Sequence, residues 1–363
     1  MNRRDFSRFS ALALAGSTLP SFAQGASSDK PIGYAAIGLG TISGMFMRAC
    51  QESQKAKITA LVTGHPDTKG KKFAAMYGIP ETSIYTYEQF DRIKDNKAVD
   101  AVYVGLPNSM HCEYTVRAAK AGKNVLCEKP MATSSVECRQ MIDACKSANV
   151  KLMIAYRCQY DPTYIEAERL VQSGALGNIQ AVEGAFGFNF ASPDFWRLKK
   201  KLAGGGSLMD VGIYPLNTAR FLLKEDPTEF TAMVSTRDKT SGRFAEMEQT
   251  VTWTMKFPSG ITGTGASTYG GTMPGFLRIN GDKGSIELSN AFGYTGSHLV
   301  SLSKAVTVDV TSSTDDVSVF RLEADHMAEC IRTNTQPKSA GEEGLKDLIA
   351  IESIYKAAGT PMA

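Results

Sequence analysis

Short apolar runs alternate with stretches of helical periodicity over the first part of the chain, beginning at Pro31. The expected strands are residues 34–37, 57–62, 99–104, 124–127 and 151–155, and the expected helices end near residue 52 or span about 70–77, 110–121 and 134–147. The strands are almost continuous in apolar residues, which is typical of strands covered on both faces. Strands separated by helices of this length predict an α/β domain with a doubly wound parallel sheet over residues 30–155.

The pattern changes after Tyr156, where a helix at about 163–173 precedes longer runs typical of strands. These expected strands are 179–186, 229–236, 250–257, 261–269, 276–280 and 285–288, and a final helix spans about 342–358. In the run 250–257 apolar residues occupy every second position, so one face is buried and the other carries Thr and Lys. The pattern predicts an α+β domain over residues 156–363 with a large, open-faced, mainly antiparallel sheet.

Residues 1–29 differ from both parts and are predicted to be an export signal followed by a short arm. Arg3 and Arg4 precede an apolar run over residues 9–19, and small residues at 21–23 suit a cleavage site. The run is too short to span a bilayer, so we expect no stable membrane insertion of the mature chain. Paired arginines in this setting are typical of the twin-arginine route, which exports folded proteins to the periplasm. An uncleaved hydrophobic anchor, or a chance Arg-Arg pair, is the alternative.

Cysteine usage favours the same route. All seven cysteines lie beyond the expected cleavage point, their number is odd, and no pair has the spacing of a metal site. A protein that folded in an oxidising compartment would more naturally pair its cysteines. We therefore expect folding in a reducing cytoplasm before export, with the cysteines as core residues and no bound metal.

The charge balance indicates a small-molecule partner. The 363 residues carry 40 Lys and Arg against 37 Asp and Glu, a formal net charge of +3. No basic run suggests a nucleic-acid site, so we expect no nucleic-acid partner.

The segment 38–43, Gly-Leu-Gly-Thr-Ile-Ser, follows the first expected strand and opens a helix. In the dinucleotide-binding fingerprint of Rossmann domains, the first glycine makes the tight turn and the second lets pyrophosphate approach the backbone. Gly38 and Gly40 occupy these positions, and Ser43 supplies the small third residue that packs the helix on the strand. The position of the segment at the first strand-to-helix turn predicts a bound dinucleotide.

The end of the second strand discriminates between NAD and NADP. An acid at this position would bind the ribose hydroxyls of NAD, but the chain has Thr63 and Gly64, with Lys69 soon after. Hydroxyl and ammonium groups suit the 2′-phosphate of NADP, which an acid would repel. NADP is therefore the expected cofactor. The alternative is that Lys69, Lys71 and Lys72 form a solvated helix face, with Asp67 close by.

Two later turns fall on the same edge of the sheet. Leu106-Pro107-Asn108 ends the run 99–104, and Asn108 could reach a nicotinamide ribose. His111 begins the next helix and is expected to be a cap or a supporting group rather than a base. Cys127-Glu128-Lys129-Pro130 ends the following strand and brings a carboxylate and an ammonium group to the edge where ligands bind. The alternative is that Glu128 and Lys129 form a solvated loop pair.

Polar residues at helical spacing follow three consecutive glycines at 204–206. Asp210, Tyr214 and Asn217 stand at i, i+4 and i+7, so we expect them to form one stripe on a helix that starts near Gly204. A stripe of this composition is not a core face and predicts contact with a ligand or water. The alternative is a capped helix with a polar outer face.

These motifs, in this order and approximate spacing, resemble the glucose-fructose oxidoreductase and inositol dehydrogenase family (Gfo/Idh/MocA). The resemblance covers essentially the whole mature chain. Three further segments, 156–162, 196–198 and 341–344, together with Tyr214 and the export signal, are similar to the glucose-fructose oxidoreductase branch. Most members of the family have histidine in place of Tyr214 and aspartate in place of Asn217. The proline-rich arm of that branch is not evident in the short segment 24–30.

The resemblance implies an NADP-dependent sugar oxidoreductase. Tyr214 would take the proton from the anomeric hydroxyl of an aldose while hydride leaves C1 for the nicotinamide; Lys129 would stabilise the phenolate, and Asp210 would orient Lys129 or a sugar hydroxyl. Tightly bound NADPH would then reduce a second sugar such as fructose. The alternatives are a dehydrogenase of an aldose, anhydro-sugar or diol with a dissociable cofactor, and a non-catalytic sugar-binding or regulatory protein.

The resemblance also implies the cofactor contacts and the assembly. The implied cofactor-binding residues are Gly38, Gly40, Thr41, Ile42, Thr63, Gly64, Lys69, Tyr87, Leu106, Pro107, Asn108, His111, Glu128, Lys129, Arg157, Trp196 and Arg197. Homodimers formed face to face, paired in some cases into homotetramers, are the implied assembly.

Overall fold

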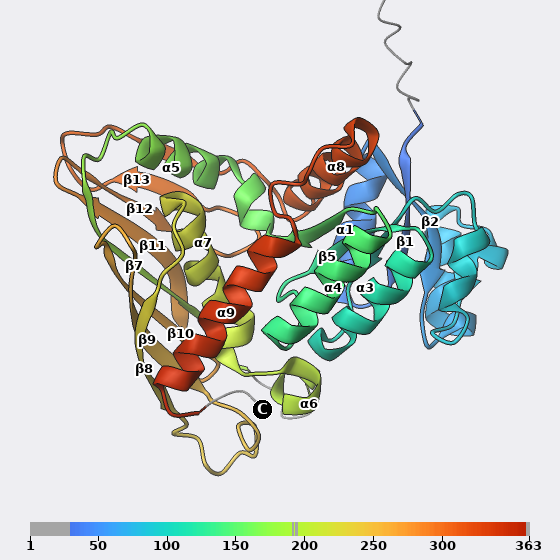
Figure 1. Cartoon of the computed structure of the whole chain (residues 1–363), viewed down its shortest axis with the longest axis horizontal. Helices are drawn as coiled ribbons and strands as arrows, with labels where there is room; N and C mark the ends of the chain where they lie inside the picture. Colours follow the sequence, from blue (N-terminus) through green and yellow to red (C-terminus); the bar gives the residue numbers. More distant parts are fainter. Residues whose placement is uncertain (1–29, 191, 193–194, 361–363) are drawn as a thin grey trace, which may run out of the picture.

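The computed structural model describes residues 30–190, 192 and 195–360. The predicted export signal and arm at residues 1–29 therefore lie outside the described residues. The described chain forms two sheets, each with its own helices, which lie next to each other in Figure 1.

The first sheet has six parallel strands, which confirms the predicted doubly wound sheet. Its order is β3-β2-β1-β4-β5-β6, with bounds Ile32–Ile37 (β1), Ala56–Val62 (β2), Ile84–Tyr85 (β3), Ala101–Val104 (β4), Asn124–Glu128 (β5) and Leu152–Ala155 (β6). Every residue of β1 and β4 is buried, because central strands of such a sheet are covered on both faces. The strand order reverses between β1 and β4, and ligands of open α/β sheets bind at the carboxyl ends of the strands at such a point.

Helices from distant parts of the chain cover both faces of this sheet (Figure 1). The connecting helices are α1 (Thr41–Glu52), α2 (Lys71–Tyr77), α3 (His111–Lys120) and α4 (Ser135–Ser147). A further helix, α8 (Ser318–Thr333), was not predicted; it packs against α1, with Ala324 and Met327 in one buried cluster with Phe46. The chain therefore returns to the first sheet after it has formed the second.

The second sheet confirms the predicted α+β region with mainly antiparallel pairing. Its order is β14-β13-β12-β11-β7-β10-β9-β8, with bounds Ile179–Gly187 (β7), Glu229–Ser235 (β8), Thr250–Lys256 (β9), Thr262–Thr268 (β10), Met273–Gly281 (β11), Ser285–Ser289 (β12), His298–Ser301 (β13) and Asp309–Thr311 (β14). Within the described strands of this sheet, β7 and β10 are the pair that runs parallel. The short strands β13 and β14 were not predicted.

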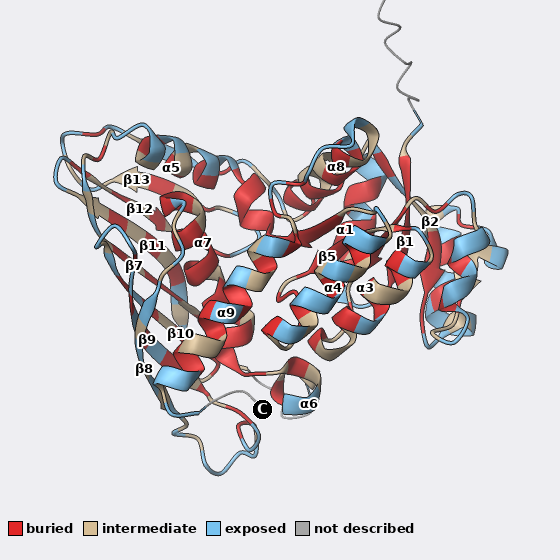
Figure 2. Ribbon diagram, viewed as in Figure 1, coloured by how far each residue is buried: buried red, intermediate tan, exposed pale blue. Residues whose placement is uncertain are grey.

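One face of the second sheet is covered and the other is open. The helices α5 (Pro162–Gln172), α7 (Ile213–Leu223) and α9 (Gly341–Ala357) contact the covered face, and the short α6 (Lys200–Ala203) lies near the first sheet (Figure 1). Along β9, Val251 and Trp253 are buried, whereas Thr252 and Thr254 are exposed, which follows the predicted alternation (Figure 2). The expected association through the open face stays a prediction.

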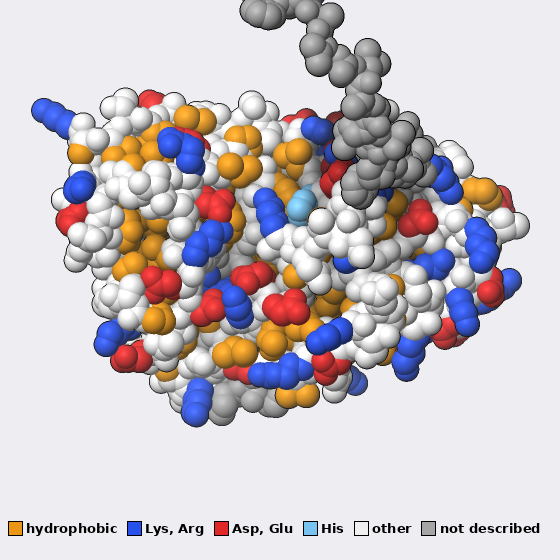
Figure 3. Space-filling view, turned by 45° about the horizontal axis from the view of Figure 1, so that its top comes forward, with side chains coloured by type: hydrophobic (Ala, Val, Ile, Leu, Met, Phe, Trp, Pro, Cys, Tyr) orange, Lys and Arg blue, Asp and Glu red, His pale blue; other side chains and the backbone are white. Residues whose placement is uncertain are grey.

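Three observations bear on the expected partners. All seven cysteines are buried and free, which fits their expected role as core residues. No helix in the described part of the chain combines the length and apolar character needed to cross a bilayer. On the face shown in Figure 3, basic and acidic side chains are interspersed over the surface rather than gathered in one region of a single sign.

Candidate active site

A cavity of about 850 Å³ opens at the carboxyl ends of the parallel strands and extends to the second sheet. Every residue that the sequence analysis assigned to catalysis or to the cofactor lines this cavity. The motifs were separated by as many as 176 positions along the chain, from Gly38 to Tyr214. The fold therefore brings them together, while the role of each residue stays a prediction.

The glycine-rich turn has the shape that a dinucleotide requires. Gly38 has φ +76°, and a Cβ there would lie 2.6 Å from the carbonyl oxygen of Gly105. A Cβ on Gly40 would meet nothing within 4 Å, so this side of the turn is open. Gly40 precedes α1 without a side-chain cap, which leaves the first amide groups of the helix available to pyrophosphate. The residues of this turn therefore fit the dinucleotide that the fingerprint predicts.

The third position of the fingerprint packs as expected. Ser43 is fully buried, and a Cβ on Gly105 would lie 2.2 Å from its hydroxyl oxygen. A larger residue at either position would push α1 away from β4.

The end of the cavity near β2 offers no carboxylate. The cavity-lining acids of the described chain are Glu128 and Asp210, which come from β5 and from the second domain. Thr63 is buried, and its hydroxyl accepts a hydrogen bond from the amide of His65 at 3.1 Å. Lys69 lines the cavity.

The other two lysines near this end do not line the cavity. Lys71 pairs with Asp67 at 3.4 Å and with Glu81 at 3.9 Å, and Lys72 is exposed. For these two residues the alternative of a solvated helix face is the better description, and Lys69 is the lysine that could contact a 2′-phosphate.

His111 connects the two turns on the sheet edge. Its ring nitrogens lie 2.9 Å from the carbonyl oxygens of Leu106 and Pro130. Burial lowers the pKa of His111, although the backbone carbonyl groups act in the opposite direction. Since both nitrogens face backbone oxygens, His111 supports the two turns, as expected from the sequence. Asn108 donates to the carbonyl oxygen of Ala203 at 2.8 Å and so links this edge to the second domain.

Glu128 and Lys129 are not a solvated loop pair. Glu128 is 8% exposed and accepts a hydrogen bond from the hydroxyl of Tyr103 at 2.5 Å. Burial raises the pKa of Glu128, and the hydrogen bond from Tyr103 opposes this shift. The Lys129 side chain is 11% exposed. The alternative considered for this pair is therefore wrong.

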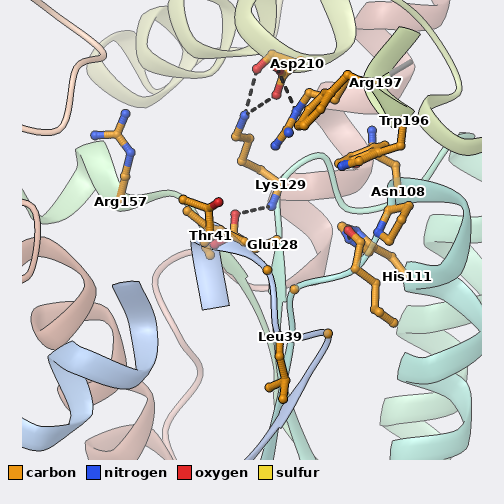
Figure 4. Close-up of a pocket in the computed structure, with 18 of the residues that line it drawn as sticks. Leu39, Thr41, Asn108, His111, Glu128, Lys129, Arg157, Trp196, Arg197 and Asp210 are labelled. Carbon is orange, nitrogen blue, oxygen red and sulfur yellow. Dashed lines mark hydrogen bonds and ion pairs between the residues drawn. The ribbon is translucent and has the colours of Figure 1, made fainter. Parts of the chain in front are cut away.

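The carboxylate of Asp210 contacts positively charged side chains of the site (Figure 4). Its carboxylate lies 3.0 Å from the ammonium group of Lys129 and 3.2 Å from Nε of Arg197, and it accepts a hydrogen bond from Tyr269 at 2.6 Å. Burial alone would raise the pKa of Asp210, but Lys129 and Arg197 lower it well below the usual range. Burial alone would lower the pKa of Lys129, but Asp210 raises it. Both members of the pair are therefore charged at neutral pH.

Tyr214 lies between two cations. The ammonium group of Lys129 is 4.4 Å from the centroid of the Tyr214 ring, and Nη2 of Arg157 donates to the Tyr214 hydroxyl at 3.3 Å. The sequence analysis paired Tyr214 with Lys129 and assigned Arg157 to the cofactor. In the structure Lys129 contacts the ring, whereas Arg157 contacts the hydroxyl.

The predicted polar stripe is wrong at Asn217. A short π-helical segment, Leu208–Gly212, precedes α7, so the helix does not run regularly from Gly204. Asn217 is 5% exposed; it donates to Asp347 at 2.9 Å and accepts from Gln159 at 3.2 Å. Its polar groups are satisfied inside the protein by α9 and by the turn after β6, and it does not line the cavity.

Aromatic residues form much of the rest of the cavity and were missed. They are Phe186, Phe188, Phe190, Phe195, Phe292, Tyr294 and Phe320. Phe186 lies in β7, and Phe188 and Phe190 follow its end at the same alternate spacing, which could have identified them. The residues from the loop between β12 and β13 carry no such signal.

A proton acceptor and a bound hydride acceptor, held at one edge of a Rossmann sheet, are what the oxidation of an alcohol requires. The cavity joins a dinucleotide turn to a tyrosine that is surrounded by cations. The fold and the site thus define an NAD(P)-dependent oxidoreductase.

Comparison with protein families narrows this class. Residues 32–156 match an oxidoreductase family with an NAD-binding Rossmann fold, and residues 164–287 match the GFO/IDH/MocA C-terminal domain. The chain belongs to the GFO/IDH/MocA oxidoreductase family.

Individual relatives span nearly the whole chain. The chain is 31% identical over 340 residues to D-xylose 1-dehydrogenase [NADP(+)] of Haloarcula marismortui, and the match covers 92% of each chain. The crystal structure of aldose-aldose oxidoreductase from Caulobacter crescentus complexed with glycerol superimposes with a TM-score of 0.87 at 44% identity, covering 91% of this chain and 98% of that one. Levoglucosan dehydrogenase in complex with NADH and levoglucosan has a TM-score of 0.78 at 20% identity over 91% of this chain and 98% of that one, and it shows the fold alone.

Proposed function

We propose that the protein is an NADP-dependent aldose oxidoreductase that oxidises C1 of one sugar and reduces a second sugar with the same bound cofactor. The observation that carries the proposal is the Tyr214 hydroxyl, which faces a guanidinium group while an ammonium group lies against its ring. A cation beside a phenol favours the phenolate, which is the form that accepts a proton. The names of the Haloarcula and Caulobacter relatives support aldoses as the substrate class.

In the proposed reaction the hydride passes to the cofactor, and side chains of the protein transfer the proton. Bound NADP supplies the acceptor for the hydride that leaves C1 of the sugar. Tyr214 takes the proton of the C1 hydroxyl, so that the C1–O bond becomes the carbonyl group of a lactone. Lys129 is held by Asp210 against the tyrosine ring, where its charge favours the phenolate. When a second sugar is reduced, Tyr214 returns the proton to the new hydroxyl group.

NADP is proposed over NAD because the adenosine end of the cavity has no carboxylate among its described lining residues and has Lys69. The name of the Haloarcula relative, which specifies NADP(+), also supports NADP as the cofactor. The predicted export signal adds a reason for permanent binding. We propose that the enzyme works in the periplasm, where no pool of free NADP would replace a cofactor that dissociated.

A dehydrogenase with a dissociable cofactor is the second candidate, favoured by the relatives named as xylose and levoglucosan dehydrogenases. The two candidates differ in the products that form without added nucleotide. Purified enzyme mixed with D-xylose alone should produce the aldonate and the alditol in equal amounts if the cofactor stays bound. Product formation that requires added NADP, with no alditol, would support the dissociable-cofactor dehydrogenase.

A further inference from the structure

Arg157 is a buried cation without a direct ion pair to an acid of the described chain. The residue begins a short turn after β6 and is 7% exposed. Its guanidinium donates to the carbonyl oxygen of Gly293 at 2.6 Å, to the carbonyl oxygen of Phe292 and to the Tyr214 hydroxyl at 3.3 Å. Of the described carboxylates, none forms an ion pair with it. Burial raises the pKa of Glu128 and of Glu323, and the guanidinium charge opposes this shift in both. The ionisable side chain to which the guanidinium donates is Tyr214.

Lys129, unlike Arg157, forms an ion pair with a carboxylate. Its ammonium group donates to the carboxylate of Asp210 and to the backbone oxygen of the same residue at 2.8 Å. An ion pair at this distance acts on a third group mainly as a dipole, so it favours the phenolate of Tyr214 less than an unpaired cation would. Figure 4 shows Arg157 and Arg197 on opposite sides of Lys129, so Asp210 and Arg197 are removed from Arg157.

The loop between β12 and β13 holds the guanidinium in place. Phe292 has φ +66°, and its backbone amide donates a hydrogen bond to the hydroxyl oxygen of Tyr164 at 2.9 Å. Asn290 shapes the same loop by donating to the carbonyl oxygens of Thr295 and Gly296 at 3.2 and 2.9 Å. Two carbonyl groups of this loop thus fix the direction in which Nη2 of Arg157 donates to Tyr214.

We propose that Arg157 is the positioning residue that holds the Tyr214 hydroxyl and stabilises its deprotonated form, with the loop 290–297 setting the placement of the guanidinium. The inference rests on the proposed role of Tyr214 as proton acceptor. It moves Arg157 from the cofactor contacts implied by the family resemblance to the proton-transfer step.

The other ionisable groups around Tyr214 are accounted for. Around Tyr214 they are Lys129 after β5, Asp210 from the π-helical segment before α7, and Tyr294 from the loop. The buried acids Glu128 and Glu323 interact with Arg157 as well. Burial raises the pKa of Tyr294, so it stays neutral in the working range. Burial alone would lower the pKa of Arg157, but Tyr214 and its other neighbours raise it, so the guanidinium stays charged.

The test compares Arg157→Gln and Arg157→Lys with a loop control, Asn290→Gly. Asn290 has φ +46°, which glycine adopts readily, so the control loosens the loop without removing a charge. The readouts are kcat and KM for D-xylose oxidation as functions of pH, with NADP supplied in excess. A second readout is the double variant Arg157→Gln/Tyr214→Phe, in which the loss of Arg157 should add little to the loss caused by Tyr214→Phe, because Arg157 acts through the Tyr214 hydroxyl.

We expect Arg157→Gln to lower kcat at neutral pH by ~10²-fold, with KM changed little. Arg157→Lys should recover most of this loss, and Asn290→Gly, which loosens the loop but keeps the charge, should lower kcat by less than Arg157→Gln does. An Arg157→Gln variant with the kcat of wild type would overturn the inference. If Tyr214→Phe keeps its turnover, the proposed function itself fails, and the two failures are thereby distinguished. If Arg157→Gln does not fold, Arg157→Lys is the test. Retention of most of the wild-type kcat by Arg157→Lys would support the inference, and its loss would contradict the inference.

Discussion

The ammonium group of Lys129 and the carboxylate of Asp210 lie 3.0 Å apart, although 81 positions separate them in the chain. Lys129 belongs to the edge of the parallel sheet, whereas Asp210 precedes α7 in the second domain. The pair therefore forms only when the two domains pack together. This contact links the half of the cavity with the dinucleotide turn to the half that contains Tyr214, the proposed proton acceptor.

Removal of the carboxylate in Asp210→Asn should destabilise the fold. Lys129 and Arg197 would remain buried without their shared counter-charge, and breaking a buried ion pair in this way costs about 3 kcal/mol or more. Turnover should fall as well, because Lys129 loses the group that holds it against Tyr214. Urea denaturation and steady-state kinetics measure the two effects. The matched control is Glu329→Gln, which removes a surface partner of Lys55 and should change stability little.

The stability difference should depend on pH with a defined sign. Although burial would raise it, the pKa of Asp210 is held below its unfolded value by Lys129 and Arg197. A carboxylate with a lowered pKa stabilises the fold fully above its unfolded value of about 3.9 and loses this contribution as the pH falls. The difference between wild type and Asp210→Asn should therefore be full at neutral pH and shrink below about pH 4. A difference that grows on acidification would contradict the assignment of Asp210 as the ionised partner.

Cofactor choice should respond to a charge at the end of β2. Thr63→Asp keeps an acceptor for the amide of His65 but places a carboxylate where the 2′-phosphate is expected. We expect relative affinity to move towards NAD by tenfold or more, which is about 1.4 kcal/mol. Thr63→Asn keeps the acceptor without the charge and should retain the preference of wild type. Equal ratios of NADP to NAD affinity in all three proteins would show that this loop does not contact the phosphate.

The nucleotide should remain with the protein through purification. The proposed export of the folded enzyme would require it to carry its cofactor, and the cavity is lined by the dinucleotide turn together with residues of the second domain. The absorbance of the purified protein should therefore change on addition of D-xylose alone, as bound NADP becomes NADPH. Protein that elutes from gel filtration without nucleotide would refute permanent binding.

The open face of the second sheet should be an interface between copies of this chain. Its exposed threonines, among them Thr252 and Thr254, form a flat polar surface beside the buried residues of the same strand. We expect sedimentation to show a dimer or a tetramer for wild type, and Thr252→Glu to favour the monomer through repulsion across the interface. A wild-type monomer at micromolar concentration would exclude this assembly.

Local signals explain what could be predicted from sequence. Gly38 and Gly40 follow a strand and open a helix, and Lys129 follows another buried strand, so the parallel topology alone places these residues on one edge. The contact of Arg157 with Tyr214 could not be predicted, because it depends on how a turn after β6 and a loop 135 positions later meet α7. The prediction for Asn217 was wrong for a related reason. The π-helical segment and the contact with the buried Asp347 arise from packing and cannot be derived from sequence spacing. The helix α8 was missed; its buried residues pack against α1 and residues of the first sheet, contacts that spacing alone does not reveal.

The central claim is that Tyr214 transfers the proton, and Tyr214→Phe tests it most directly. Phenylalanine keeps the ring that contacts Lys129, Phe186 and Phe292, so folding and NADP binding should survive. Loss of a general base typically lowers the rate by ~10² to 10⁴. The loss should appear in kcat rather than in KM, since the interaction is made chiefly in the transition state. Steady-state oxidation of D-xylose across the pH range is the measurement. A kcat reduced by at least ~10²-fold with KM unchanged is the predicted result, whereas turnover close to that of wild type with the same pH profile would contradict the account.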